Sequence, residues 1–403
     1  MEATIEKIKK EFKLTPQEAL ADIFPIKKSL YIGIPKEDFF QEKRIPLTPN
    51  SIASLINQGH RIVIESCAGE ASNFDDEEYI NAGAQIVTSK EEVFKANIIL
   101  KTAPITNSEV QYFQSNQAIF SPILIPHLDK NIMKRMMQLK ITAIAYDYIK
   151  ASENYYPYVD SMGDIAGSFS IILAGKYLSG ENGKGILLGG IAGQPPCKVL
   201  IIGAGNVGLA AAKSAIGLGA QVQIFDDDIQ LLNQIRNQLG NNIYTSVLDP
   251  LNLKKNLSRA DVAIGALHHI DGLTPKIITE TMVAQMKKSA VIIDTCIDHG
   301  GCFETSRITN HDQPIFIKHG VIHYCVPNIT SSVSRTASYS MSNILTPLFR
   351  KLSQYGGIES FVRSDKYFRN GVFLYKGTIT KEFIASKFEL KYTDLNLLIT
   401  SDF

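Results

Sequence analysis

The stretch that decides the fold is VLIIGAGNVGLAAAKSAIGLGAQVQIFDDD, residues 199–228. Its four apolar residues at 199–202 favour a β-strand, and the small side chains at 209–216 favour a closely packed helix. Between them lies GAGNVG, residues 203–208, which has the pattern G-x-G-x-x-G. Glycine-rich turns are common in α/β proteins, so the pattern alone is weak evidence. Its position between a predicted strand and a predicted helix is what gives it weight.

Each glycine of this turn has a separate task in binding a dinucleotide. Gly203 allows a tight turn, Gly205 lets the backbone approach a pyrophosphate, and Gly208 lets the helix pack closely on the sheet. The amide groups at the start of the helix then point at the phosphates. Asp226 ends the next predicted strand, 221–225, where a carboxylate binds the ribose hydroxyls and repels a 2′-phosphate. The sequence therefore predicts a nucleotide site that takes NAD and not NADP.

The composition is that of an ordinary globular protein. The chain has 403 residues, of which 45% are hydrophobic and 20% charged, and its formal net charge is +1. This length predicts two domains, and the charge gives no support for a nucleic-acid or membrane partner. No apolar run approaches the roughly 18 residues of a membrane span, and residues 1–20 lack an apolar signal core. We therefore expect a cytoplasmic protein.

The cysteines give no sign of a metal site. The five are Cys67, Cys197, Cys296, Cys302 and Cys325, and no two form a C-x-x-C pair. Their odd number and the apolar surroundings of several favour buried thiols over disulfides or zinc ligands. We therefore expect no metal.

The region before the glycine turn predicts a second α/β domain, because strands and helices alternate there without a glycine fingerprint. The expected strands are 30–34, 61–65, 85–87, 98–100, 118–125 and 141–147. The expected helices are 49–58, 75–82, 89–95 and 130–139, with a long helix at 164–178 and a loop at 180–196.

The region after Asp226 continues the nucleotide domain. Apolar runs at 262–266, 290–294 and 322–326 predict further parallel strands interleaved with helices. A long helix is expected from Ser338, and the tail to Phe403 is expected to return to the first domain.

Several segments besides the glycine turn resemble the alanine dehydrogenase and nicotinamide nucleotide transhydrogenase family. They are IGIPKEDFFQEKRIPLTP (32–49), GHRIVIESCAGEASNFDDEEYINAGAQIV (59–87), VIIDTCIDHGGCFETSR (291–307) and HYCVPNITSSVSRTASYSMSN (323–343). The resemblance covers roughly residues 30 to 380 and keeps the family's order of motifs. It implies an α/β fold of two Rossmann-like domains, with the NAD domain inserted into a discontinuous substrate domain. The implied boundaries are 1–157 and 336–403 for the substrate (catalytic) domain and 158–335 for the NAD-binding domain.

The same resemblance implies three residues that act on an amino-acid substrate. Arg44 matches the family's carboxylate-binding arginine, whose guanidinium offers two parallel hydrogen bonds to a carboxylate. His127 matches the catalytic histidine, which can protonate the substrate oxygen or accept a proton from the attacking water. Asp298 matches the aspartate between the domains, which can stabilise a cationic iminium.

Around the cofactor, the resemblance adds contacts to those of the glycine turn. Asn206 and Val207 within the turn, together with Leu267 and Asn328, are expected to bind NAD alongside Asp226.

The sequence also departs from the alanine dehydrogenase pattern. Lys101 matches the first of two family lysines, but Ala103 stands near the second, which is a substrate contact. Either Lys101 approaches the cleft in its place, or Arg44 alone holds the substrate. Gly163 stands where the family has a serine, and LHHIDG (267–272) places His268 and His269 near the nicotinamide.

These residues predict NAD-dependent oxidative deamination of L-alanine to pyruvate and ammonium, which is reversible. Two alternatives stay open. One is another amino-acid or imino-acid dehydrogenase of the family, of the saccharopine type, and the other is a non-catalytic NAD-binding protein. The family forms hexamers or dimers, so the resemblance implies a homo-oligomer.

The cofactor preference can be tested at Asp226. The variants Asp226→Ser and Asp226→Ala should relax the preference from NAD toward NADP, because they remove the charge that repels a 2′-phosphate. Titration of wild type and variants with both reduced cofactors measures this. Wild-type protein that binds NADPH as tightly as NADH would contradict the role of Asp226.

Overall fold

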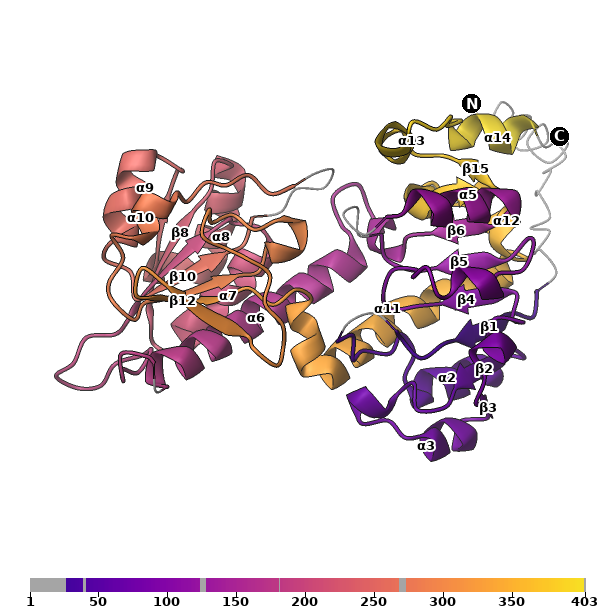
Figure 1. The fold of residues 1–403 in the computed structure, drawn as a ribbon, viewed down its shortest axis with the longest axis horizontal. Coiled ribbons are helices and arrows are strands. Elements are labelled where there is room, and N and C mark those ends of the chain that lie inside the picture. Colours follow the sequence, from indigo (N-terminus) through magenta and orange to yellow (C-terminus); the bar gives the residue numbers. More distant parts are fainter. Residues whose placement is uncertain (1–26, 39–40, 124–127, 181, 268–272, 402–403) are drawn as a thin grey trace, which may run out of the picture.

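The computed structural model describes residues 27–38, 41–123, 128–180, 182–267 and 273–401. Figure 1 shows two lobes, each built around a twisted sheet with helices on its faces. Helices α6 (Pro157–Ser179) and α11 (Ser334–Gln354) extend from one lobe to the other. Within the described ranges, no helix is both long enough and apolar enough to cross a lipid bilayer.

The first lobe contains strands from both parts of the chain. Its sheet has the order β15-β14-β6-β5-β4-β1-β2-β3. The strands are β1 (Tyr31–Ile34), β2 (Arg61–Glu65), β3 (Gln85–Val87), β4 (Ile98–Leu100), β5 (Ala118–Phe120), β6 (Thr142–Ile144), β14 (Val372–Tyr375) and β15 (Thr378–Ile379). The first six are parallel, and β14 pairs antiparallel to β6 and to β15. The C-terminal part of the chain therefore returns to the first sheet, as the predicted discontinuous domain requires.

Short helices connect these strands. They are α2 (Pro49–Ile56), α3 (Asp76–Asn81), α4 (Lys90–Val93) and α5 (Lys130–Gln138), and after α11 come α12 (Ile358–Ser364), α13 (Glu382–Phe388) and α14 (Leu395–Ser401). All four connecting helices lie where the sequence predicted them, with ends that differ by one or two residues.

The second lobe is a doubly wound sheet of the order β12-β13-β11-β10-β7-β8-β9. Its strands are β7 (Lys198–Ile202), β8 (Gln221–Phe225), β9 (Ile243–Ser246), β10 (Val262–Gly265), β11 (Val291–Asp294), β12 (Ile315–Lys318) and β13 (Val321–Tyr324). Its helices are α7 (Asn206–Gly217), α8 (Ile229–Leu239), α9 (Pro250–Leu257) and α10 (Glu280–Val283). The strand order reverses between β7 and β10, so a ligand crevice is expected at the carboxyl ends of these two strands.

Neighbouring residues of one strand pack into different cores, which explains the nearly continuous apolar runs in the sequence. In β7, Val199 and Ile201 belong to one cluster of buried side chains, whereas Leu200 and Ile202 belong to another. Both faces of the sheet are therefore covered, as is usual for parallel sheets.

Two of the expected strands are shorter than predicted. The run 118–125 forms a strand only at Ala118–Phe120, and 141–147 only at Thr142–Ile144. Pro122 cannot donate to a sheet, and residues 146–148 form a 3₁₀ turn. Residues 124 and 125 lie outside the described ranges.

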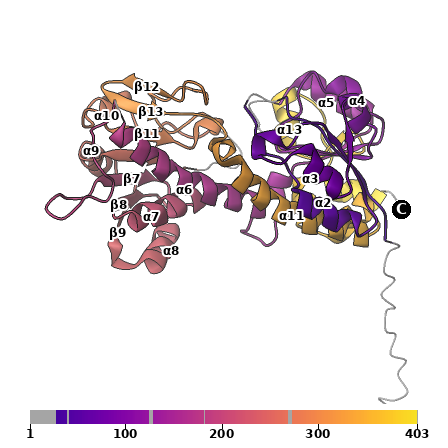
Figure 2. The same cartoon turned by 90° about the horizontal axis from the view of Figure 1, so that it is seen from below.

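The two helices that join the lobes are longer than predicted. Helix α6 begins at Pro157 and not at Asp164, with the proline at a position where its missing N–H costs nothing. Helix α11 begins at Ser334, four residues before the expected start. Figure 2 shows both helices passing between the lobes from a second direction.

Helices α6 and α7 pack very closely, and glycine makes this contact possible. A β-carbon on Gly167 of α6 would lie 2.2 Å from the Val207 carbonyl oxygen and 2.8 Å from the Ala210 β-carbon in α7. Helix α6 therefore lies against the helix that follows the glycine turn and fixes its position.

We expect Gly167→Ala to lower the free energy of unfolding by about 1–3 kcal/mol, because the added methyl group forces the two helices apart. Gly217→Ala is the matched control, because a β-carbon at the end of α7 meets no atom of the part of the chain that the structure describes within 4 Å. This control should be neutral or slightly stabilising. Urea unfolding measures the free energy of unfolding of both variants. Equal stability of the two variants would show that the contact between α6 and α7 can accommodate an added methyl group.

Candidate active site

The glycine turn has the shape that a bound pyrophosphate needs. Gly203 has a φ of 113°, and a β-carbon there would lie 2.3 Å from the Ala266 carbonyl oxygen. A β-carbon on Gly208 would lie 2.0 Å from the Gly203 oxygen, whereas one on Gly205 would meet no atom of the described residues within 4 Å. Two glycines are thus required by packing, and the middle one faces open space at the start of α7. The N-cap residue, Gly205, has no side chain to cap this helix, so the first amides of the helix can bind phosphate. The residues present therefore fit a dinucleotide.

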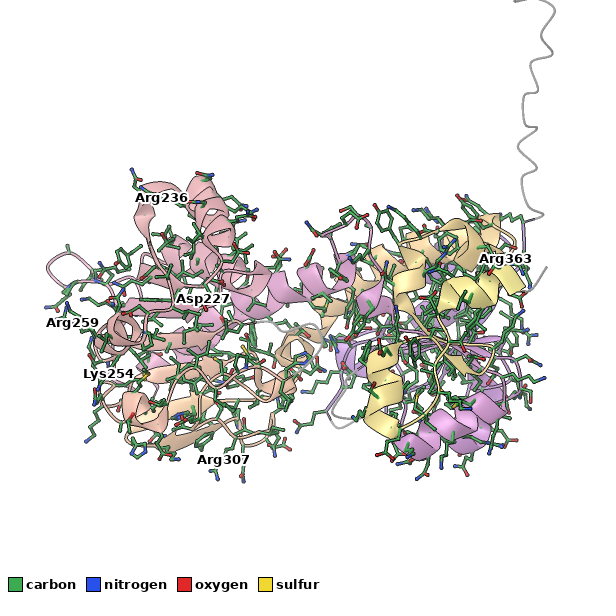
Figure 3. All side chains as sticks on the ribbon, turned by 90° about the horizontal axis from the view of Figure 1, so that it is seen from above. Asp227, Arg236, Lys254, Arg259, Arg307 and Arg363 are labelled. Atoms are coloured by element: carbon green, nitrogen blue, oxygen red, sulfur yellow. The ribbon has the colours of Figure 1, made fainter. Side chains whose placement is uncertain are left out.

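Asp226 lies directly after β8 and is bonded to this turn. Its carboxylate accepts hydrogen bonds from the backbone N–H of Ala204 at 2.6 Å and of Asp228 at 2.8 Å. Asp227, labelled in Figure 3, is exposed and adds negative charge at the same strand end. This charge is unfavourable for a 2′-phosphate, in agreement with the predicted NAD preference.

The other predicted cofactor residues lie around the same strand ends. Leu267 follows β10, and its backbone nitrogen lies against Gly203. The Asn206 side chain donates to Asp160 of α6, and Val207 packs beside Gly163 of the same helix. Their contacts with NAD stay predictions. Gly163, in place of the family's serine, lies where α6 meets the start of α7.

Arg44 is buried in the loop between β1 and α2, and its guanidinium is already partly engaged. Nε and Nη2 donate to the two carboxylate oxygens of Glu42 at 2.8 and 2.7 Å. Nη1 donates to Thr330 Oγ1 at 3.0 Å and to the Tyr158 hydroxyl at 3.4 Å. Burial opposes the charge of Arg44, but the Glu42 carboxylate outweighs this effect and raises the pKa of Arg44. The arginine is therefore held as a cation.

Asp298 belongs to the second lobe, in the 3₁₀ turn η6 (Ile297–His299) after β11. Its carboxylate oxygens accept the backbone N–H of Asn328 at 3.0 and 3.2 Å. Asn328 has a φ of 53°, and its side-chain Nδ2 donates to Glu42 Oε2 at 2.6 Å. Hydrogen bonds through Glu42 and Asn328 thus join Asp298 to Arg44. The structure brings these two predicted residues together.

Lys101 lies at the carboxyl end of β4 in a buried group of three charges. Its Nζ is 2.6 Å from Glu37 and 2.6 Å from Glu109, and the lysine side chain is 0% exposed. Burial raises the pKa of Glu37, although Lys101 opposes this effect. Two of the three ammonium donors thus bind carboxylates of the protein, and a substrate contact by Lys101 stays a prediction.

Ala103, near the place of the missing second lysine, is part of the same network. Its backbone N–H and that of Thr102 donate to Glu37 Oε1 at 3.2 and 2.6 Å. The predicted His127, and also His268 and His269, lie outside the described residues.

Sequence reasoning missed Glu42, Tyr158 and Thr330, which surround Arg44. A charge opposite to that of Arg44, two positions before it, was the one available signal for Glu42. Tyr158 and Thr330 lie more than one hundred residues away in the sequence, and no local pattern connects them to Arg44.

The buried carboxylate of Asp294 holds the loop that carries Asp298. This carboxylate accepts hydrogen bonds from the backbone N–H groups of Cys296 and Cys302, each at 3.1 Å, and from the Ser306 hydroxyl at 2.6 Å. Ligand atoms of Asp294, Cys296 and Cys302 lie within 4.8 Å of one another, a grouping that the sequence spacing did not reveal. Because three donors already bind the carboxylate, we assign it the task of shaping the loop.

All five cysteines are free thiols, and all but Cys67 are buried, as predicted for most of them.

The structure has two α/β lobes, a glycine turn at the switch point of one, and a hydrogen-bonded arginine–aspartate network between them. These features define a two-domain, dinucleotide-binding oxidoreductase. Residues 33–166 match the model of the N-terminal domain of alanine dehydrogenase/PNT, and 170–382 match that of its C-terminal domain. The chain belongs to the alanine dehydrogenase/PNT family, which uses NAD.

Individual relatives agree with this assignment. The chain is 36% identical to alanine dehydrogenase 2 of Staphylococcus aureus (strain USA300) over 363 residues, which cover 90% of this chain and 97% of that protein. A solved L-alanine dehydrogenase superposes with a TM-score of 0.83 at 32% identity, covering 89% of this chain and 99% of that one. A transhydrogenase from Sinorhizobium meliloti shares the fold, with a TM-score of 0.75 at 20% identity over 86% of this chain and 99% of that one.

The buried ion group makes a prediction about stability. Lys101→Met should lower the free energy of unfolding by about 3–5 kcal/mol, because it leaves two buried carboxylates without a cation. The loss should be larger at about pH 8 than at about pH 5. Unpaired buried carboxylates have raised pKa values, so the folded state gains stability as they become protonated.

Lys366→Met is the matched control, because this lysine pairs with Glu153 on the surface and both side chains are largely exposed. Urea unfolding of the two variants at both pH values measures the difference. Equal stability of Lys101→Met and wild type would show that these carboxylates do not depend on the lysine.

Proposed function

We propose that the protein catalyses the reversible reaction of L-alanine, NAD⁺ and water to pyruvate, ammonium, NADH and a proton. This proposal rests on the chain of hydrogen bonds that joins Arg44 to Asp298 through Glu42 and Asn328, beside a turn that fits a dinucleotide. The similarity to alanine dehydrogenases over most of the chain supports alanine as the substrate.

The proposed task of Arg44 is to bind the substrate carboxylate. Glu42 occupies the Nε and Nη2 edge of its guanidinium, so the substrate carboxylate would bind at the second hydrogen of Nη2 and at Nη1, where it would replace a hydroxyl contact. These two nitrogens offer parallel hydrogen bonds, which fix the orientation of the carboxylate as well as its charge. The Thr330 hydroxyl and the Tyr158 hydroxyl lie at the same edge.

Asp298 and His127 are proposed to act on the reacting carbon and its substituents. Bound NAD would supply the hydride acceptor. The Asp298 carboxylate would stabilise the positive charge of the iminium that forms from the amine. His127 would accept a proton from the water that attacks this iminium, and in the reverse direction would protonate the departing oxygen.

A second candidate is another amino-acid or imino-acid dehydrogenase of the saccharopine type. Ala103 favours it, because this position provides only a backbone bond to Glu37 where alanine dehydrogenases have a substrate-binding lysine. A site with one fewer cation would select a different set of substrates.

The remaining partners follow from the sequence and the family. We propose a cytoplasmic homo-oligomer, a hexamer or a dimer, with a small-molecule substrate and neither nucleic acid nor membrane as a partner.

The function is tested by the rate of NADH formation with NAD and each of a set of amino acids, including L-alanine, D-alanine, L-glutamate and saccharopine. We expect L-alanine to give the highest kcat/KM, and pyruvate with ammonium to consume NADH. Activity confined to saccharopine would support the second candidate. A protein that binds NADH and oxidises none of these compounds would contradict both.

Arg44→Lys should raise the KM for L-alanine about 10- to 100-fold, because lysine keeps the charge and loses the parallel donors, a change of about 1.5–3 kcal/mol. Arg61→Lys is the control, since Arg61 is exposed at the start of β2. Steady-state kinetics of both variants, with thermal melting as a check of folding, measures the effect. An unchanged KM and kcat in Arg44→Lys would place this arginine outside the substrate site.

A further inference from the structure

Glu42 is the most heavily bonded carboxylate around Arg44, and the family resemblance did not assign it a role. Its side chain is only 1% exposed. Oε1 accepts the backbone N–H of Arg44 at 2.9 Å and its Nε at 2.8 Å. Oε2 accepts Arg44 Nη2 at 2.7 Å and Asn328 Nδ2 at 2.6 Å. Both oxygens are therefore fully used.

These bonds fix the plane of the guanidinium. A two-point pair between a carboxylate and the Nε and Nη2 edge of arginine leaves little freedom of rotation. The third nitrogen, Nη1, is then directed at Thr330 of the other lobe, 3.0 Å away. Glu42 thus determines which edge of Arg44 is available for a ligand.

The hydrogen bond between Glu42 and Asn328 connects this arrangement to the second lobe. The Asn328 side chain binds Glu42, and its backbone N–H binds the Asp298 carboxylate. A second link runs from Arg44 Nη1 to Thr330, whose hydroxyl donates to Asn328 Oδ1 at 3.1 Å. One residue, Asn328, therefore connects the arginine side of the site with the aspartate side.

The charge of Glu42 is preserved in this setting. Burial alone would raise its pKa, but Arg44 and the other donors outweigh burial and lower the pKa of the Glu42 carboxyl. A neutral amide has the same shape, but it has one acceptor oxygen in place of two. In either orientation, it would lose two of the four bonds described above.

We propose that Glu42 is a positioning residue of the dehydrogenase reaction. Glu42 orients Arg44 for the substrate carboxylate and, through Asn328, fixes the position of Asp298 relative to Arg44. This inference rests on the proposed function. In addition, substrate binding by Arg44 and the placement of Asp298 both depend on the Glu42 carboxylate, which contacts neither the substrate nor the cofactor.

The test compares Glu42→Gln with wild type by steady-state kinetics on L-alanine and by NADH titration. We expect the KM for alanine to rise at least 10-fold and kcat to fall at least 10-fold, because both Arg44 and Asp298 lose their support. The Kd for NADH should stay within about twofold, since the glycine turn and Asp226 bind the adenosine half independently.

Asp261→Asn is the matched control for the loss of a carboxylate that binds several donors. Asp261 accepts hydrogen bonds from Lys184, Lys287 and the backbone N–H of Lys198. It lies at the amino end of β10, whereas the site lies at the carboxyl ends of the strands. This variant should lower the melting temperature and leave KM and kcat within about twofold.

Thr330→Val separates the link through Thr330 from the link through Glu42. It removes the hydroxyl that accepts from Arg44 Nη1 and leaves the Glu42 pair in place. It should therefore raise the KM for alanine several-fold with a smaller change in kcat.

The outcomes distinguish this inference from the proposed function. Wild-type protein without alanine-dependent NADH formation would remove the proposed function. Active wild type with a folded Glu42→Gln variant that behaves like Asp261→Asn would overturn the role of Glu42 alone. If Glu42→Gln does not fold, Glu42→Asp serves in its place, because the shorter side chain cannot reach both Arg44 and Asn328, and a folded Glu42→Asp enzyme with unchanged KM and kcat would overturn it.

Discussion

The ion pair between Glu42 and Arg44 is the interaction on which the site depends. It lies where the loop after β1 meets the segment that follows β13, so it is bonded to both lobes at once. The hydrogen bonds that Glu42 accepts from Arg44 and Asn328 offset the free-energy cost of burying its charge. A site assembled in this way brings together residues that are far apart in the sequence.

Buried charges recur at the carboxyl ends of the parallel strands in both sheets. Glu37, Lys101 and Glu109 form one group beside β1 and β4, and Asp294 holds the loop after β11. In each case the carboxylate is bound by several donors, most of them backbone amides or cations. Such groups shape the loops that carry function, because an isolated charge would be strongly unfavourable there.

Much of the fold could be predicted from local sequence patterns. Gly203, Gly205 and Gly208 identified the turn because each has a separate steric reason, and the apolar runs gave most strands to within one or two residues. Strands β9, β12, β14 and β15 were missed. Strands β9 and β12 lie at the two edges of their sheet and are partly exposed, so their patterns are less apolar than those of the central strands. The starts of α6 and α11 were placed too late, because their first turns pack between the lobes.

The candidate site was harder to predict than the fold. Arg44 and Asp298 could be named from family motifs, but their connection through Asn328 arises only from tertiary structure. For Lys101 the sequence offered two readings, and the structure shows the lysine bound to two carboxylates that are 64 and 8 residues away. Hydrogen-bond partners at such distances leave no periodic signal, so local reasoning cannot identify them.

In the proposed complex, Glu42 and Arg44 stay paired while Arg44 binds the substrate carboxylate through Nη1 and Nη2. A crystal structure of the protein with NADH and pyruvate tests this most directly. We predict a pyruvate carboxylate within about 3.2 Å of Arg44 Nη1 and Nη2, with Glu42 still bound at Nε. A carboxylate bound out of reach of Arg44, or a Glu42 side chain turned away from the arginine, would contradict it.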